Sequence, residues 1–155
     1  MGGGPGPFPA AHRGRGSGGA LTVERSGSGS ALVLLPGFGA RSQIWAPVLD
    51  ELARQFEVVS VNLPGFGSPG LPAGVAASVE TLTDAVGEWL TGHGYRHPQV
   101  AGNSLGAAIA LELAKRGQVA SVCAISPIGF WAAGESRLGA ALGSRASLMQ
   151  HRTGA

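Results

Sequence analysis

Short apolar runs alternate with helix-like segments from residue 20 onwards, and this alternation constrains the fold more than any other feature of the sequence. A strand that is followed by a helix and a parallel strand makes a right-handed crossover. The sequence therefore predicts an α/β fold with a mostly parallel sheet flanked by helices. The predicted strands are 20–25 (ALTVER), 31–35 (ALVLL), 57–62 (EVVSVN), 98–103 (PQVAGN) and 119–126 (VASVCAIS).

Three helices are predicted between these strands. The first begins at Ser42, a good N-cap residue, and carries Pro47 in its first turn. The second begins near Ser78, where Glu80 in the first turn complements the helix dipole. The third follows Ser104 and is apolar nearly all round, as is typical of a helix buried beside a sheet. The apolar face predicted for the first helix consists of Ile44, Trp45, Val48, Leu49 and Leu52.

The length of 155 residues allows one domain at most. Residues 1–19 are rich in Gly, Pro and Arg and are predicted to be a disordered tail, whereas 20–130 form the folded core. Residues 131–155 have weak helical periodicity and few large apolar side chains. They are interpreted as the beginning of a further segment or as an unstructured end.

The charge and hydropathy of the chain exclude several classes of function. The formal net charge is only +2, and the eleven basic residues are scattered, so an RNA-associated module has little support. The longest apolar stretch, 122–133, is shorter than the roughly 20 residues that a membrane span needs. The N-terminus has no hydrophobic signal core. We expect a cytoplasmic protein with no nucleic-acid or membrane partner.

The cysteine count and the glycine patterns bear on redox compartment and cofactors. The single cysteine, Cys123, excludes an internal disulfide and fits a reducing cytosol. Because it lies within the apolar run 119–126, it is predicted to be a buried structural thiol. No Gly-x-Gly-x-x-Gly follows a strand and no P-loop is present, so nucleotide binding has no support. No cofactor and no metal are implied.

A serine stands between two glycines at 102–106 (GNSLG), where the strand 98–103 meets the third helix. A nucleophile elbow requires this order of strand, tight turn and helix, with the serine in a strained conformation. Side chains at the flanking positions would collide with the neighbouring strand and helix, which explains the glycines. The Gly-x-Ser-x-Gly pattern alone is weak evidence in a chain with 27 glycines, but its place between a predicted strand and a predicted helix is the one that an elbow requires. Ser104 is therefore the candidate nucleophile.

A serine that attacks a carbonyl group needs N–H donors for the developing negative charge, each worth roughly 10²–10³ in rate. The first candidate is the backbone N–H of Leu105, at the start of a helix whose dipole favours an anion. The second should come from the loop after an earlier strand, where PGFG stands at 36–39. Phe38 is the predicted donor there.

Three segments, LLPGFG at 34–39, VVSVNLPGFGSPG at 58–70 and VAGNSLGAAIALELA at 100–114, resemble the α/β-hydrolase family in order and spacing. The resemblance covers about residues 20–130 and implies the α/β-hydrolase fold with a serine nucleophile. The chain departs from the family pattern at four positions. Pro36 replaces the usual His, Asn62 replaces the usual Asp, and Ser68 stands one residue early, with Pro69 in its place. These departures loosen the assignment to a subfamily.

A serine at position 104 argues against haloalkane dehalogenases and epoxide hydrolases, which resemble this pattern but carry Asp there. The resemblance implies a hydrolase that acts on an ester-like or related carbonyl of a small-molecule substrate. Esterase, lipase, thioesterase and carbon–carbon bond hydrolase remain open. The alternative is a binding protein that uses the same fold without catalysis, or an inactive fragment. For a hydrolase, the resemblance implies that the segment beginning at 129–131 (GFW) leads into a lid, so 131–155 is its start or an unstructured end.

The acid that orients the catalytic base follows the serine in this family, and the histidine comes last. Asp50 and Asp84 both precede Ser104. Glu112 lies about 12 Å along the third helix, which is too far to orient a histidine at the elbow. Only Glu135 has a permissible place in the chain, although a solvated loop glutamate is the better interpretation.

The histidines are no better placed to act as the base. His97 precedes the strand that ends at Ser104, which puts it roughly 20 Å away at the opposite edge of the sheet, and His93 shares that edge. His12 falls in the predicted tail, and His151 is four residues from the end. The sequence therefore predicts a chain that stops before the strands that supply acid and base. The run 119–126 should then lie at a sheet edge and make the chain poorly soluble.

Overall fold

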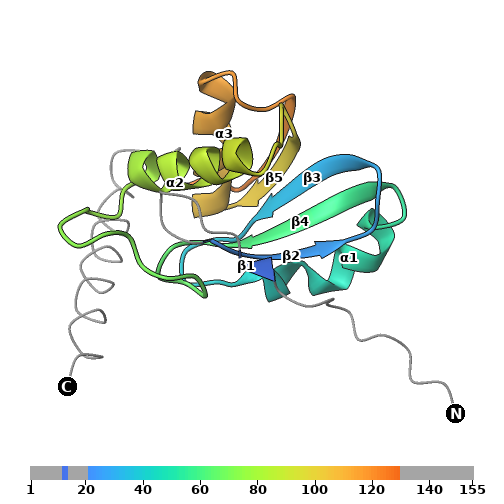
Figure 1. The fold of residues 1–155 in the computed structure, drawn as a ribbon, viewed down its shortest axis with the longest axis horizontal. Coiled ribbons are helices and arrows are strands. Elements are labelled where there is room, and N and C mark those ends of the chain that lie inside the picture. Colours follow the sequence, from blue (N-terminus) through green and yellow to red (C-terminus); the bar gives the residue numbers. More distant parts are fainter. Residues whose placement is uncertain (1–11, 14–20, 130–155) are drawn as a thin grey trace, which may run out of the picture.

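The computed structural model describes residues 12–13 and 21–129, which form one six-stranded sheet with helices on both faces (Figure 1). The strands are β1 (His12–Arg13), β2 (Thr22–Ser26), β3 (Ser30–Leu35), β4 (Phe56–Asn62), β5 (Gln99–Asn103) and β6 (Ser121–Ile125). The helices are the 3₁₀ helix η1 (Ser42–Trp45) and the α-helices α1 (Ala46–Leu52), α2 (Val79–Gly92) and α3 (Leu105–Lys115).

The strand order is β1-β2-β4-β3-β5-β6. Strands β4, β3, β5 and β6 are parallel, β2 runs antiparallel to β4 at one side, and β1 pairs antiparallel with β2. The predicted α/β class with a mostly parallel sheet is confirmed. The two-residue strand β1 lies within the predicted tail and pairs with β2, which the sequence does not predict. The register of the parallel strands brings their carboxyl ends to one edge, because Leu35 lies beside Gly102 and Asn103 beside Ile125.

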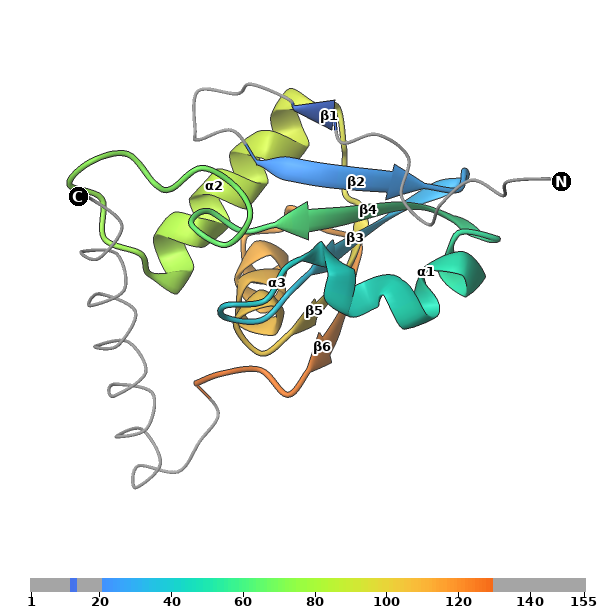
Figure 2. The same cartoon turned by 90° about the horizontal axis from the view of Figure 1, so that it is seen from below.

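Helices α2 and α3 cover one face of the sheet, and η1 and α1 lie against the other (Figure 2). The larger hydrophobic cluster joins the sheet to α2 and α3, and the smaller one joins it to α1. The larger cluster includes Val33, Val59, Val86, Trp89 and Ile109, and the smaller one includes Leu32, Leu34, Leu49 and Val58. Buried side chains on both faces explain why β3 and β4 are almost continuously apolar in sequence.

Helix α2 begins where the sequence predicts it. Ser78 is the N-cap, and its side chain accepts a hydrogen bond from the Thr81 backbone N–H. The Thr81 hydroxyl in turn accepts from the Ser78 backbone N–H, which completes a capping box. Glu80 lies in the first turn as expected, and a backbone hydrogen bond holds the pKa of its carboxyl below the usual range.

The first predicted helix differs from expectation in two ways. Ser42 is not an N-cap, because the chain winds first as η1, with Arg41 in the cap position, and the Ser42 groups bond elsewhere. The predicted apolar face is also wrong in part, since Ile44 and Val48 are 43% and 45% exposed. A short helix such as α1 buries little surface, and Leu49 is its buried side chain.

Strand β6 lies at the edge of the described sheet, as predicted, because it pairs with β5 alone. Val122 packs against the larger cluster on the α3 side. Cys123 and Ile125 alternate with it and face the other side, where α1 lies against β4 and does not reach. The prediction that Cys123 is buried is therefore wrong, and the thiol is exposed.

Some predictions fall outside the described residues. They concern most of the tail 1–19, the segment 131–155 with its suggested lid, and the residues Glu135 and His151.

Candidate active site

Ser104 occupies the junction between β5, which ends at Asn103, and α3, which begins at Leu105. Its backbone has φ 53° and ψ −110°, a conformation that non-glycine residues rarely adopt. The Ser104 N–H donates to the Ile125 carbonyl oxygen at 2.9 Å, and its own carbonyl accepts from the Ala108 N–H at 3.1 Å. Strand β6 and the first turn of α3 therefore hold the strained turn in place.

The glycines on either side of Ser104 are required by close backbone contacts. A Cβ at Gly102 would collide with the carbonyl oxygen of Gly106 in α3. A Cβ at Gly106 would collide with the carbonyl oxygen of Leu35 at the end of β3, and would lie 2.6 Å from the Pro36 carbonyl oxygen. The expected collisions with helix and strand are confirmed, and their absence lets α3 start against the end of β3.

The loop after β3 passes directly over this junction. A Cβ at Gly37 would lie 3.4 Å from the Ser104 Cβ and 3.0 Å from the Asn103 side-chain oxygen. The Ala40 N–H donates to the Gly37 carbonyl at 3.2 Å, which closes a turn with Phe38 inside it. The Phe38 side chain is 47% exposed. The loop backbone at Gly37 therefore lies so close to Ser104 that an added Cβ would contact the serine side chain.

The two N–H groups that the sequence predicts as donors have no acceptor among the residues that the structure describes. They belong to Phe38, in the loop after β3, and to Leu105, the first residue of α3. The first N–H groups of a helix have no partner within the helix, and no side chain caps α3. Leu105 directly follows Ser104, and Phe38 follows Gly37, where an added Cβ would lie 3.4 Å from the Ser104 Cβ.

The loop after β4 is tied to its surroundings by a set of hydrogen bonds that the sequence analysis misses. The buried Asn62 side-chain oxygen accepts from the Ser42 backbone N–H at 2.8 Å. Ser68 donates its hydroxyl to the Asn62 carbonyl at 2.6 Å and accepts from the Thr22 N–H at 2.7 Å. Asn62 replaces the usual Asp of the family pattern, and Ser68 stands one residue early. These two departures are the signals of the loop contacts that the sequence offers.

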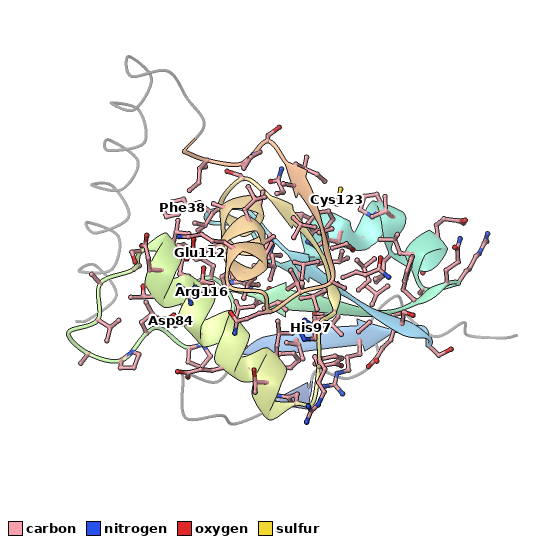
Figure 3. The ribbon with its side chains drawn as sticks, turned by 90° about the horizontal axis from the view of Figure 1, so that it is seen from above. Phe38, Asp84, His97, Glu112, Arg116 and Cys123 are labelled. Atoms are coloured by element: carbon pink, nitrogen blue, oxygen red, sulfur yellow. The ribbon has the colours of Figure 1, made fainter. Side chains whose placement is uncertain are left out.

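The acidic residues near α3 are engaged on the outer surface. Glu112 pairs with Lys115 and Arg116, and Arg116 also pairs with Asp84 of α2 (Figure 3). Hydrogen bonds from Lys115 and then Arg116 hold the pKa of Glu112 below its usual range. This geometry agrees with the exclusion of Glu112 and Asp84 as partners of Ser104.

The described histidines lie away from Ser104. The His93 ring stacks on Trp89, and its Nδ1 is 2.8 Å from the Trp89 carbonyl oxygen at the end of α2. His97 precedes β5, at the opposite end of that strand from Ser104. Between residues 21 and 129, no side chain forms a hydrogen bond with the Ser104 hydroxyl. No group of three His, Cys, Asp or Glu in this part of the chain could hold a metal ion.

Two hollows in the described surface lie near the amino ends of the parallel strands. One hollow of about 500 Å³ is lined by nine residues, among them Arg25, Glu57, Tyr95 and Arg96. The Tyr95 hydroxyl donates to Glu57 at 2.9 Å, and burial together with this bond raises the pKa of Tyr95 to about 12. None of the helices in the described ranges has the length and apolar character of a membrane span.

Comparison with known proteins identifies the family to which the chain belongs. The profile described as "Alpha/beta hydrolase family" matches residues 32–154. A pimeloyl-[acyl-carrier protein] methyl ester esterase of Aeromonas hydrophila is 36% identical over 61% of this chain and 35% of its own length. The chain thus spans about a third of the length of such curated relatives.

Two solved structures show the same architecture. A membrane phospholipase A, a bacterial virulence factor, has a TM-score of 0.75 and 30% identity over 82% of this chain and 42% of its own. The N-acyl homoserine lactonase AidH, complexed with N-butanoyl homoserine, has a TM-score of 0.70 and 27% identity over 77% of this chain and 45% of its own. The strained serine turn, the sheet order and these matches lead to one conclusion: the chain belongs to the α/β-hydrolase family and covers its N-terminal portion.

Proposed function

We propose that this chain carries the nucleophile of a hydrolase that acts on carboxylic esters of small molecules, and that the nucleophile is Ser104. The observation that carries the proposal is the positive φ of Ser104 at a junction whose flanking glycines have no room for a side chain. Such strain costs of order 1–3 kcal/mol and persists where the surrounding structure imposes it, most often at functional sites. His97 and Ser126 also have positive φ, so the proposal depends on the combination of this strain at Ser104 with the close backbone contacts at Gly102 and Gly106.

The step that these residues support is acyl transfer. The Ser104 Oγ attacks the ester carbonyl carbon, and the carbonyl oxygen becomes negatively charged as the tetrahedral intermediate forms. The backbone N–H groups of Leu105 and Phe38, which have no other described acceptor, would donate to that oxygen. The alcohol then leaves, and water releases the acid from the serine. The proton acceptor for the serine hydroxyl is not among the residues 21–129 that surround it.

The substrate class rests on the relatives. The esterase, the phospholipase and the lactonase bear names that denote hydrolysis of an ester bond. A thioester or a carbon–carbon bond alpha to a carbonyl would present the same carbonyl to Ser104. We place carboxylic esters first because the relatives share them, and we keep a cytoplasmic location as a prediction.

A fluorophosphonate probe tests the nucleophile, since it phosphonylates a reactive serine, and oxyanion donors retain part of the reactivity when the base is missing. We expect labelling of the 155-residue chain and its loss in Ser104→Ala. Ser126→Ala is the matched control, because Ser126 also has a positive φ of 47° but lies after β6. Labelling that survives Ser104→Ala would refute the assignment.

The second candidate is a binding protein that uses the fold without catalysis. It is favoured by the lack of a described side chain that is hydrogen-bonded to the Ser104 hydroxyl. A folded chain that binds an ester analogue but shows no labelling of Ser104 would support this candidate over the first.

A further inference from the structure

We propose that Asn62 is a positioning residue for the oxyanion donor Phe38, and that it acts through the backbone of Ser42. This inference rests on the proposed function, because it concerns the same site. Asn62 is at the carboxyl end of β4 and touches neither the serine nor the Phe38 backbone in any described contact. Its effect on the donor must therefore pass through the loop that it anchors.

The anchor is buried at both ends. Asn62 is 4% exposed and Ser42 is fully buried, and the N–H of Ser42 donates to the Asn62 side-chain oxygen at 2.8 Å. A buried N–H that lost this acceptor would have no water to replace it. Strand β4 is paired on both sides, with β2 and with β3, so the acceptor is fixed to the centre of the sheet.

The distance along the chain from the anchor to the donor is short. The loop leaves β3 at Leu35 and is anchored again at Ser42, so its two ends are fixed. Between them, the Gly37 to Ala40 hydrogen bond closes the turn that contains Phe38. A connection of six residues between fixed ends, with an internal hydrogen bond, leaves the Phe38 N–H few alternative orientations.

The loop after β4 supports the same arrangement from the other side. The Phe38 and Phe66 rings meet edge to face with centroids 5.0 Å apart. Gly67, at φ 95°, packs on Asn62 so closely that a Cβ there would lie 3.0 Å from the Asn62 Cγ. Ser68 then closes the loop onto the Asn62 carbonyl. The two loops therefore share Asn62 as a common contact.

The position of Glu24 gives a physical reason for an amide rather than a carboxylate at position 62. The Ser42 hydroxyl donates to a Glu24 carboxylate oxygen at 3.2 Å, while the Ser42 N–H donates to Asn62. One serine thus brings both side chains together. An aspartate at 62 would accept the same hydrogen bond but would add a second negative charge close to the partly buried Glu24 carboxylate.

The Ser42 backbone offers a matched pair of variants. Ser42→Pro removes the N–H that reaches Asn62, whereas Ser42→Ala keeps it and removes only the hydroxyl. Proline suits the first position of a helix, and the preceding Arg41 has φ −120° and ψ 172°, which a following proline favours. Asn62→Leu is a second variant that removes the acceptor, and Asn62→Asp keeps it.

The readout is the kinetics of fluorophosphonate labelling of Ser104, separated into a maximal rate constant and an apparent affinity. We expect Ser42→Pro and Asn62→Leu to lower the maximal rate constant about tenfold to 100-fold, since small misplacements of catalytic groups have effects of that order. The apparent affinity should remain within about twofold. Ser42→Ala and Asn62→Asp should retain most of the rate. A loss of affinity with unchanged maximal rate would overturn the proposal.

Amide hydrogen exchange separates this proposal from the proposed function. If the unchanged chain is not labelled, the nucleophile assignment fails, and exchange at Ala40, whose N–H donates to the Gly37 carbonyl within the loop, decides the anchor alone. We expect faster exchange in this loop in Ser42→Pro and Asn62→Leu but not in Ser42→Ala, with β3 unaffected. Unchanged exchange in both anchor variants would overturn the role of Asn62.

Discussion

The backbone N–H of Ser104 donates a hydrogen bond to the Ile125 carbonyl oxygen, 2.9 Å away. This bond ties the strained turn to the last residue of β6, the strand at the open edge of the described sheet. Only the backbone of Ile125 takes part in this bond, and the Ile125 side chain is 42% exposed. The strand that holds the backbone of the candidate nucleophile is thus also the edge strand of the described sheet, and it exposes an apolar side chain.

Ile125→Lys should raise the soluble fraction of the chain without unfolding it. A lysine on an edge strand opposes pairing with other molecules, and the carbonyl that holds Ser104 is unchanged. The soluble fraction and light scattering measure the effect. Ile44→Lys is the matched control, because Ile44 is 43% exposed but lies in η1 rather than on an edge strand. An equal gain from both variants would show that edge pairing is not the cause.

Gly106→Ala should lower the free energy of unfolding by about 1–3 kcal/mol or more, as is usual for overpacking in a tight site. The added methyl group collides with the Leu35 carbonyl, which is backbone and cannot move aside as a side chain can. Urea unfolding measures the change. Gly92→Ala serves as control, since a Cβ there meets nothing within 4 Å at the end of α2. A neutral effect of Gly106→Ala would contradict the close approach of α3 to β3.

Ser78→Ala should destabilise the chain by about 1 kcal/mol, the usual effect of losing an N-cap. The Ser78 side chain accepts the Thr81 N–H at 3.2 Å, and no other cap of α2 replaces it. Ser78→Asp should retain the stability, because aspartate caps equally well. Thermal unfolding of the two variants checks the prediction, which fails if both behave alike.

Tyr95 should ionise in the folded chain at about pH 12, well above the usual value of 10 for a tyrosine. Burial is the main cause, and the hydrogen bond to Glu57 adds to it. The folded state binds this proton more tightly than the unfolded state. The stability it contributes is therefore complete below pH 10 and is lost as the pH rises towards 12.

Phenolate absorbance measures this ionisation directly, because Tyr95 is the single tyrosine of the sequence. In urea the same titration should fall near the usual value. Glu57→Gln keeps an acceptor and removes the charge, so the pKa should drop only part of the way, since burial remains. Titration of the folded chain near pH 10 would show that the ring is hydrated.

The sequence predicts the sheet and the elbow well because their signals are local. The apolar runs of β3 and β4 follow from burial on both faces, and the start of α2 near Ser78 is visible from Ser78 and Glu80. The glycines around Ser104 are equally readable, since their need arises from contacts at one tight junction.

The errors concern residues whose surroundings depend on distant parts of the chain. Cys123 lies in an apolar run, yet it is exposed, because the face of β6 that it occupies has no helix over it among the described residues. Ser42 has the character of a cap, but its N–H bonds Asn62, twenty residues further on. No local sequence pattern specifies a pairing between Ser42 and Asn62. The pairing is seen only in the folded chain, where the loop after β3 meets the end of β4.

The most direct test of the central claim is peptide mapping by mass spectrometry after fluorophosphonate treatment of the folded chain. We expect one adduct, on the peptide that contains Ser104, with none in Ser104→Ala and an undiminished signal in Ser126→Ala. An adduct on another serine, or a folded chain that remains unlabelled at saturating probe, would contradict it.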